Sequence, residues 1–204
     1  MKGEIMNPIR PQNYISLDLE LNNKQDGTTP RIIQVGVSIG SPVMPDDIKT
    51  FSWYINPEQE ISPFISNLTG ITDEIIKEKA VQHETVAQEL GALLTVNECF
   101  CSPITWGQND NLELLQEFRD RNIHFPFFGH RCFDVKTTHV FTQIVNGKSP
   151  GGSLKKSMRS YGLEFVGESH RADIDSLNTL RFFFFFLERQ RVFEQYMHLM
   201  KETK

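Results

Sequence analysis

The fold is decided by residues 14–21, Tyr-Ile-Ser-Leu-Asp-Leu-Glu-Leu (YISLDLEL). Isoleucine and leucine alternate here with polar side chains, which is the period of two of a β-strand with one apolar face. The acids Asp18 and Glu20 stand two residues apart, so both carboxylates project from the same face. Unpaired acids in a central strand are costly, and a divalent metal ion would remove that cost. The stretch therefore predicts a central strand and a candidate metal site.

Two more strands are expected directly after this one. Residues 31–39 (RIIQVGVSI) alternate again, and residues 48–55 (IKTFSWYI) form a third candidate. The polar stretch 22–30 between the first two holds an Asp-Gly turn signal, and Pro30 disfavours helix there. Three successive strands with short polar joints predict an antiparallel meander.

Beyond residue 60 the apolar residues follow the period of helices instead. Helices are expected at 62–67, from the Thr72 cap, at 85–96, from Asn109, at 133–145, from Ser153 to near Gly162, and at about 172–200, with one short strand at 104–106. We therefore expect an α/β or α+β fold with its strands first. The chain predicts a single domain over 1–204, with a core at about 14–187 and a C-terminal helix to about 200.

Composition and length exclude several classes of protein. The 204 residues are 39% hydrophobic and 23% charged, as in one globular domain. The longest purely apolar run, 182–187, is far shorter than the ~18 residues of a membrane span, and residues 1–12 lack the apolar segment of a secretory signal. Cys99, Cys101 and Cys132 are too few for a disulfide framework and lack a fourth ligand for zinc. We predict a cytoplasmic protein.

Charge and aromatic residues each leave two interpretations open. The net charge is −5, but residues 131–181 carry eight basic and five acidic side chains. A locally basic face fits a phosphate-handling enzyme, and it also fits an ordinary solvated surface. The five phenylalanines at 182–186 go all the way round a helix. They indicate either a partner surface or, as we prefer, a terminal helix wedged between the sheet and another helix.

Three further residues complete a candidate site. Asp110 begins a helix directly after the short strand; alone, it would be an ordinary first-turn acid. His170 and Asp175 flank a loop-to-helix junction, and the small Ala172 between them permits close backbone approach. Four carboxylates suit two Mg²⁺ or Mn²⁺ ions, which activate water and stabilise a leaving alkoxide at a phosphodiester. A neutral histidine can accept the proton of that water.

These motifs also resemble a known family. Asp18-x-Glu20, Asp110 and His170-x-Ala172-x-x-Asp175 are similar, in order and approximate spacing, to the motifs of the DnaQ-like (DEDDh, ribonuclease T-like) 3′→5′ exonucleases, over about residues 14–187. The Eri-type branch, which trims RNA 3′ ends, is resembled in three further places: Pro63 with the 67–72 segment NLTGIT, Trp106-Gly107, and the 133–136 segment FDVK.

The resemblance implies a ribonuclease H-like fold with a mixed five-stranded sheet flanked by helices. It implies two ions, Mg²⁺ or Mn²⁺, held by Asp18, Glu20, Asp110 and Asp175, with His170 as general base. It also implies contacts to the terminal nucleotide from a further set: Leu21, Leu68, Thr69, Gly70 and Ile71. Thr69-Gly70 reads equally well as a turn before the Thr72 cap.

The function expected from these features is metal-dependent 3′→5′ exonuclease activity. It would release nucleoside monophosphates from single-stranded 3′ ends, RNA being favoured over DNA. Two alternatives stay open: a proofreading-type DNA exonuclease subunit that acts with a polymerase, and a catalytically silent nucleic-acid-binding module of the same fold. A silent module should lack a ligand, and all five positions are filled. The expected partner is a single-stranded RNA or DNA 3′ end and no membrane; a protein partner or a homo-oligomer stays open.

Overall fold

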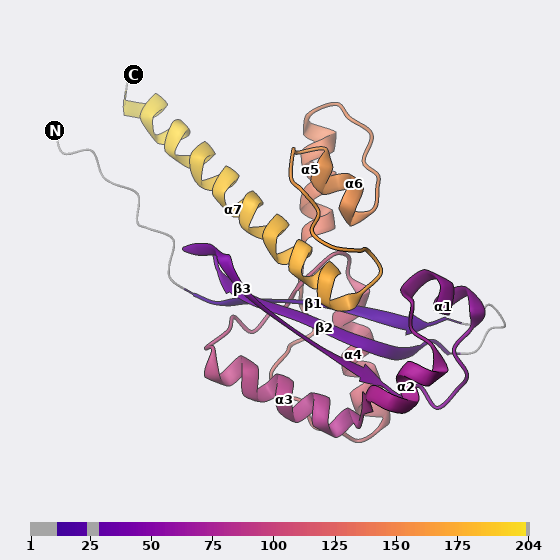
Figure 1. The fold of residues 1–204 in the computed structure, drawn as a ribbon. Coiled ribbons are helices and arrows are strands. Elements are labelled where there is room, and N and C mark those ends of the chain that lie inside the picture. Colours follow the sequence, from indigo (N-terminus) through magenta and orange to yellow (C-terminus); the bar gives the residue numbers. More distant parts are fainter. Residues whose placement is uncertain (1–11, 24–28, 203–204) are drawn as a thin grey trace.

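A computed structural model describes residues 12–23 and 29–202 of the chain, built around one mixed β-sheet (Figure 1). The strand order is β4-β3-β2-β1-β5-β6. The strands are β1 (Tyr14–Asn22), β2 (Arg31–Ser41), β3 (Met44–Ile55), β4 (Ala80–Val81), β5 (Ile104–Thr105) and β6 (Phe133–Asp134). The first three form the predicted antiparallel meander, and β5 pairs with β1 in parallel.

Helices cover both faces of the sheet (Figure 1). They are α1 (Pro63–Thr69), α2 (Asp73–Lys79), α3 (His83–Val96), α4 (Asn109–Asp120), α5 (Val135–Val145), α6 (Leu154–Arg159) and α7 (Ala172–Glu202). Helices α3 and α4 lie on one face, while α7 crosses the other face with α5 and α6 beside it. None of the helices among residues 12–23 and 29–202 is both long and apolar enough to cross a membrane.

The alternation along β2 gives the two faces different partners. Val35 and Val37 are fully buried in the core that includes α3 and α4. The opposite positions carry Gln34, Gly36 and Ser38, and these face α7. Small side chains on this face let the start of α7 approach the sheet closely, which decides where the site forms.

The phenylalanine run packs α7 between the sheet on one side and helices α5 and α6 on the other. Phe183 packs edge-on against Tyr14 of β1, with ring centroids 5.2 Å apart, whereas Phe182 packs against Tyr161, with centroids 5.4 Å apart. Phe186 also contacts Tyr161, and Phe184, on the opposite side of the helix from Phe182, is buried as well. The preferred interpretation, a terminal helix wedged between the sheet and another helix, is confirmed.

Two details of the expected fold differ in the structure. The sheet has six strands rather than five, because Ala80–Val81 pairs in parallel with β3 as the chain leaves α2. The helix expected from Phe133 begins at Val135, since Phe133 donates its N–H to the Pro103 carbonyl (2.8 Å) and pairs with β5. Asp134 then caps α5 through its carboxylate. Such two-residue pairings leave no periodic pattern in a sequence.

Candidate functional site

The strand β1 brings Asp18 and Glu20 to the sheet face that α7 covers. Glu20 is 9% exposed, and burial, followed by the charges of Asp175 and Asp110, raises its pKa to about 8. Burial also raises the pKa of Asp18 well above its usual range, with further contributions from Asp110, Asp175 and Glu20. Removing a carboxylate from water and placing it near others both disfavour its charged form. The two acids predicted from the strand pattern therefore lie in one negative cluster.

Asp110 joins this cluster because β5 runs parallel to β1. The chain leaves β5 at the same edge of the sheet, turns at Gly107 and enters α4, where Asp110 lies in the first turn. Asp134 holds this turn by accepting a hydrogen bond from the Gly107 N–H (3.0 Å). Burial, then the charges of Glu113 and Asp134, raise the pKa of Asp110 to about 7.

The first turn of α7 packs on β1 and β2 and brings Asp175 to the acids of β1. A Cβ built on Gly36 would lie 2.0 Å from the Ala172 carbonyl carbon, so only glycine lets the helix start rest on the strand backbone. Gly36 is the cross-strand partner of Asp18. One turn further, Ser16 donates its hydroxyl to the Ser176 carbonyl (2.7 Å). This packing places the Asp175 carboxyl beside the strand acids.

His170 completes the arrangement from the loop before α7. Its φ of 67° lies in the left-handed region, which histidine tolerates better than most residues. Its N–H donates to Asp175 Oδ2 (2.9 Å). One ligand atom each of Glu20, His170 and Asp175 lies within 4.8 Å of the other two, and His170 is exposed to solvent. Strand and helix thus present one imidazole and two carboxylates to a single point.

The donor set fits hard divalent cations. Among the residues that the structure describes, Asp175 Oδ1 is buried without a hydrogen-bond partner. Its pKa is raised by burial, although the His170 N–H and charge act in the opposite direction. A buried, unpartnered carboxylate oxygen beside three other acids is stable when a cation balances the charge, and oxygen is the ligand that Mg²⁺ and Mn²⁺ take.

The three cysteines do not form a comparable site. They are free thiols, and the metal-type cluster found within 12–23 and 29–202 consists of Glu20, His170 and Asp175. Zinc binding by the cysteines, the alternative considered from the sequence, therefore has no support in the described part of the chain.

The residues expected to contact the terminal nucleotide divide into two kinds. Thr69 and Ile71 are buried, and the Thr69 hydroxyl donates to the Ile65 carbonyl while accepting the Ile71 N–H. Their side chains build the turn after α1. Leu68 is 40% exposed, Gly70 is exposed in the left-handed conformation (φ 74°), and Leu21 is half-buried at the β1–β2 bulge. Only these three offer free surface.

Comparison with known proteins gives the family. The RNase_T family, described as exonuclease, matches residues 15–183. The chain belongs to this exonuclease family. It is 23% identical over 149 residues to ERI1 exoribonuclease 2 of Danio rerio, an alignment that covers 63% of this chain and 26% of that protein. The chain thus spans about a quarter of this relative's length.

Solved structures show the same fold. The nuclease domain of 3'hExo, a DEDDh family member bound to rAMP, superimposes with a TM-score of 0.75 at 18% identity, covering 88% of this chain and 94% of that one. Cell-death related nuclease 4 (CRN-4) gives 0.72 at 18% identity, covering 87% and 64%. The resemblance to the exonuclease family and the ribonuclease H-like fold that it implies are therefore confirmed.

Sequence reasoning missed the residues that hold this site in place. Gln34 and Gly36 on β2 support the start of α7, and Asp134 supports the turn before Asp110.

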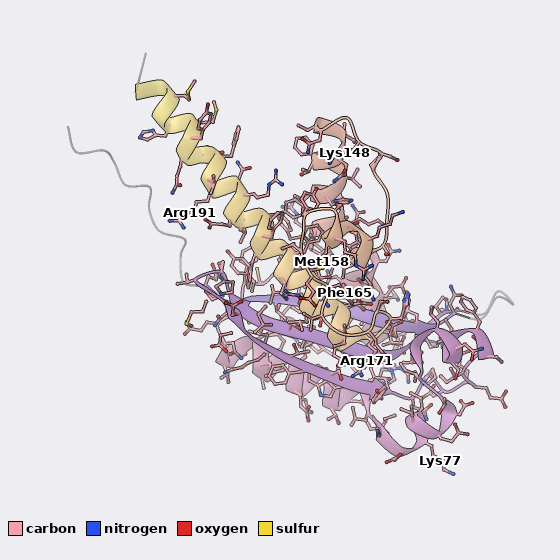
Figure 2. All side chains as sticks on the ribbon, turned by 45° about the horizontal axis from the view of Figure 1, so that its top comes forward. Lys77, Lys148, Met158, Phe165, Arg171 and Arg191 are labelled. Atoms are coloured by element: carbon pink, nitrogen blue, oxygen red, sulfur yellow. The ribbon has the colours of Figure 1, made fainter. Side chains whose placement is uncertain are left out.

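The basic residues expected to form a positively charged face differ in their surroundings. Arg171 forms an ion pair with Asp173 (2.9 Å), whereas the charge of Lys155 lowers the pKa of Asp175. Figure 2 labels Arg171 at the start of α7.

Proposed function

We propose that this protein is a metal-dependent 3′→5′ exonuclease that removes nucleoside monophosphates from single-stranded 3′ ends, with RNA preferred over DNA. The observation that carries the proposal is the convergence of acids from β1, α4 and α7 with His170 at one edge of the sheet. Family membership supplies the reaction class. The assignment of each residue's role is part of the proposal.

Asp18, Glu20, Asp110 and Asp175 are the residues that would hold the cations. Two bound divalent ions supply activation of the attacking water and stabilisation of the leaving oxygen in phosphodiester hydrolysis. Asp175 is oriented for this role, because the His170 N–H occupies Oδ2 and leaves the buried Oδ1 free.

His170 is the proposed general base. Its imidazole lies within 4.8 Å of oxygens of Glu20 and Asp175 and also reaches solvent, so it can take a proton from water and pass it on. The water oxygen forms the new bond to phosphorus, and the bond from phosphorus to the 3′-oxygen of the preceding nucleotide breaks. That 3′-oxygen leaves with a proton, giving a nucleoside monophosphate and a shortened strand.

The preference for RNA is supported by relatives. The curated relative is named an exoribonuclease, and another similar structure concerns 3′-end recognition of a histone mRNA stem-loop by a 3′-exonuclease. It superimposes with a TM-score of 0.76 at 18% identity, covering 88% of this chain and 65% of that one. We place the terminal nucleotide against the exposed surface of Leu21, Leu68 and Gly70, with Thr69 and Ile71 holding the turn. A cytoplasmic location and any protein partner or second copy stay predictions.

The test is a gel with 5′-labelled single-stranded RNA and DNA of one sequence, each with Mg²⁺, Mn²⁺ or chelator. We expect a metal-dependent ladder that shortens from the 3′ end, faster on RNA. Asp110→Asn should abolish it, whereas Asp120→Asn, an exposed acid on the same helix, should not. Faster cleavage of DNA would favour the proofreading-type alternative. Folded protein that gives no ladder on either substrate would refute the enzyme and favour the silent binding module.

A further inference from the structure

The first turn of α7 is capped by a side chain from another element. The earliest backbone bond of the helix runs from the Asp175 N–H to the Arg171 carbonyl (2.8 Å), and first-turn N–H groups have no partner within a helix. Ala172 is fully buried, and its N–H donates to Gln34 Oε1 (3.1 Å). The Arg171 side chain is engaged elsewhere, with Asp173. The strand β2 thus supplies the cap of α7.

Gln34 also lies next to Glu20 of β1 in the sheet while it contacts the first turn of α7. It is the cross-strand partner of Glu20, so both side chains lie on the face that α7 covers. Through Ala172 it holds the helix two residues after His170 and three before Asp175. Gln34 is itself only 1% exposed, so its side chain has little freedom to adjust. One residue therefore connects the strand acids to the helix acids.

We propose that Gln34 is a positioning residue: it fixes the first turn of α7 against β1 and so sets the spacing of Glu20 and Asp175 for cation binding, with His170 held beside them. Without the Gln34 oxygen, the buried Ala172 N–H has no acceptor in its present place, and the helix start shifts to find one. Residues that orient metal ligands typically change metal affinity by about 10- to 100-fold. This inference rests on the proposed function.

Paired variants separate the hydrogen bond from side-chain volume. Gln34→Met removes the acceptor at similar size, and Gln34→Glu keeps an oxygen at the same place. Mn²⁺ binding is titrated by electron paramagnetic resonance without nucleic acid, and folding is followed by circular dichroism. We expect Gln34→Met to weaken Mn²⁺ binding by about tenfold or more, and Gln34→Glu to bind at least as tightly as the wild-type protein.

The control for stability is Leu90→Ala in α3, on the other face of the sheet. Leu90 is fully buried in the core there, so its truncation destabilises the fold away from the site. It should lower the melting temperature and leave Mn²⁺ affinity unchanged. Wild-type affinity in Gln34→Met, or an equal loss in Leu90→Ala, would overturn the role of Gln34 alone. A wild-type protein that binds no Mn²⁺ would overturn the proposed function and this inference together.

Discussion

Replacing Gly36 by alanine is expected to disable the site without altering any acidic side chain. Gly36 is the cross-strand partner of Asp18 and lies directly under the first turn of α7. Its φ is not among the positive values, so alanine can adopt this backbone. An added methyl group in a strand would otherwise stabilise slightly by restricting the unfolded chain. Any loss therefore comes from the contact with the helix.

The size of the effect follows from the spacing. The alanine Cβ would lie 2.0 Å from the Ala172 carbonyl carbon and 2.2 Å from its oxygen. Non-bonded carbon atoms rest about 3.5–4 Å apart, so the helix start must retreat by roughly 1.5 Å. Because the obstructing atoms are backbone, no side-chain rotation relieves the clash. Overpacking costs about 1–3 kcal/mol of stability, and a 1 Å displacement of reacting groups costs about 10²-fold in rate.

Gly40→Ala is the matched control on the same face of the same strand. Its Cβ would meet the Ile48 Cγ1 atom at 3.0 Å, and that side chain can move. We compare kcat/KM on labelled RNA, Mn²⁺ affinity and urea unfolding for both variants. Gly36→Ala should lose about 10²-fold or more in kcat/KM together with Mn²⁺ affinity, and Gly40→Ala should lose neither. Normal turnover and Mn²⁺ affinity in Gly36→Ala would refute the close docking of α7 on β2.

Three further predictions concern the charged groups. His170→Asn keeps a residue that tolerates the left-handed backbone, and it should lower the rate by about 10²–10⁴-fold with Mn²⁺ affinity nearly unchanged; a loss of affinity in the same titration would make His170 a ligand instead. Because the pKa values of Glu20 (about 8) and Asp110 (about 7) are raised, the folded metal-free protein holds more protons than the unfolded chain. Its stability should therefore fall from about pH 5 to 8 in chelator, while Mn²⁺ affinity rises over that range as protons leave; a flat urea-midpoint profile would contradict the shifts. Asp18→Asn should raise the unfolding midpoint of the metal-free protein by removing repulsion and should abolish the stabilisation by Mn²⁺, and an unchanged response to Mn²⁺ would exclude Asp18 as a ligand.

The alternation in β1 predicts the strand and its acids, but it does not show what covers them. An alternating Ser16, Asp18 and Glu20 reads as the solvent face of a strand. In the structure Ser16 is fully buried and bonded to Ser176, 160 residues away. Periodicity reports which residues share a face, whereas the partner of that face is decided by contacts distant in the chain. For the same reason the sequence does not predict the roles of Gln34 and Gly36, because a polar and a small residue are common within any strand.

The packing of the phenylalanine run, residues 182–186, holds α7 in place beside the acids of this site. Four carboxylates gathered in one place repel one another: burial, followed by the charges of neighbouring acids of the site, raises the pKa values of Asp18 and Glu20. Two turns after Asp175, the run from Phe182 buries ring after ring against β1 and Tyr161. Each large apolar side chain contributes about 1.5–3 kcal/mol when buried. The bulky aromatic packing thus holds α7 on the sheet, and the glycine and glutamine under its first turn decide where along the sheet the acids meet.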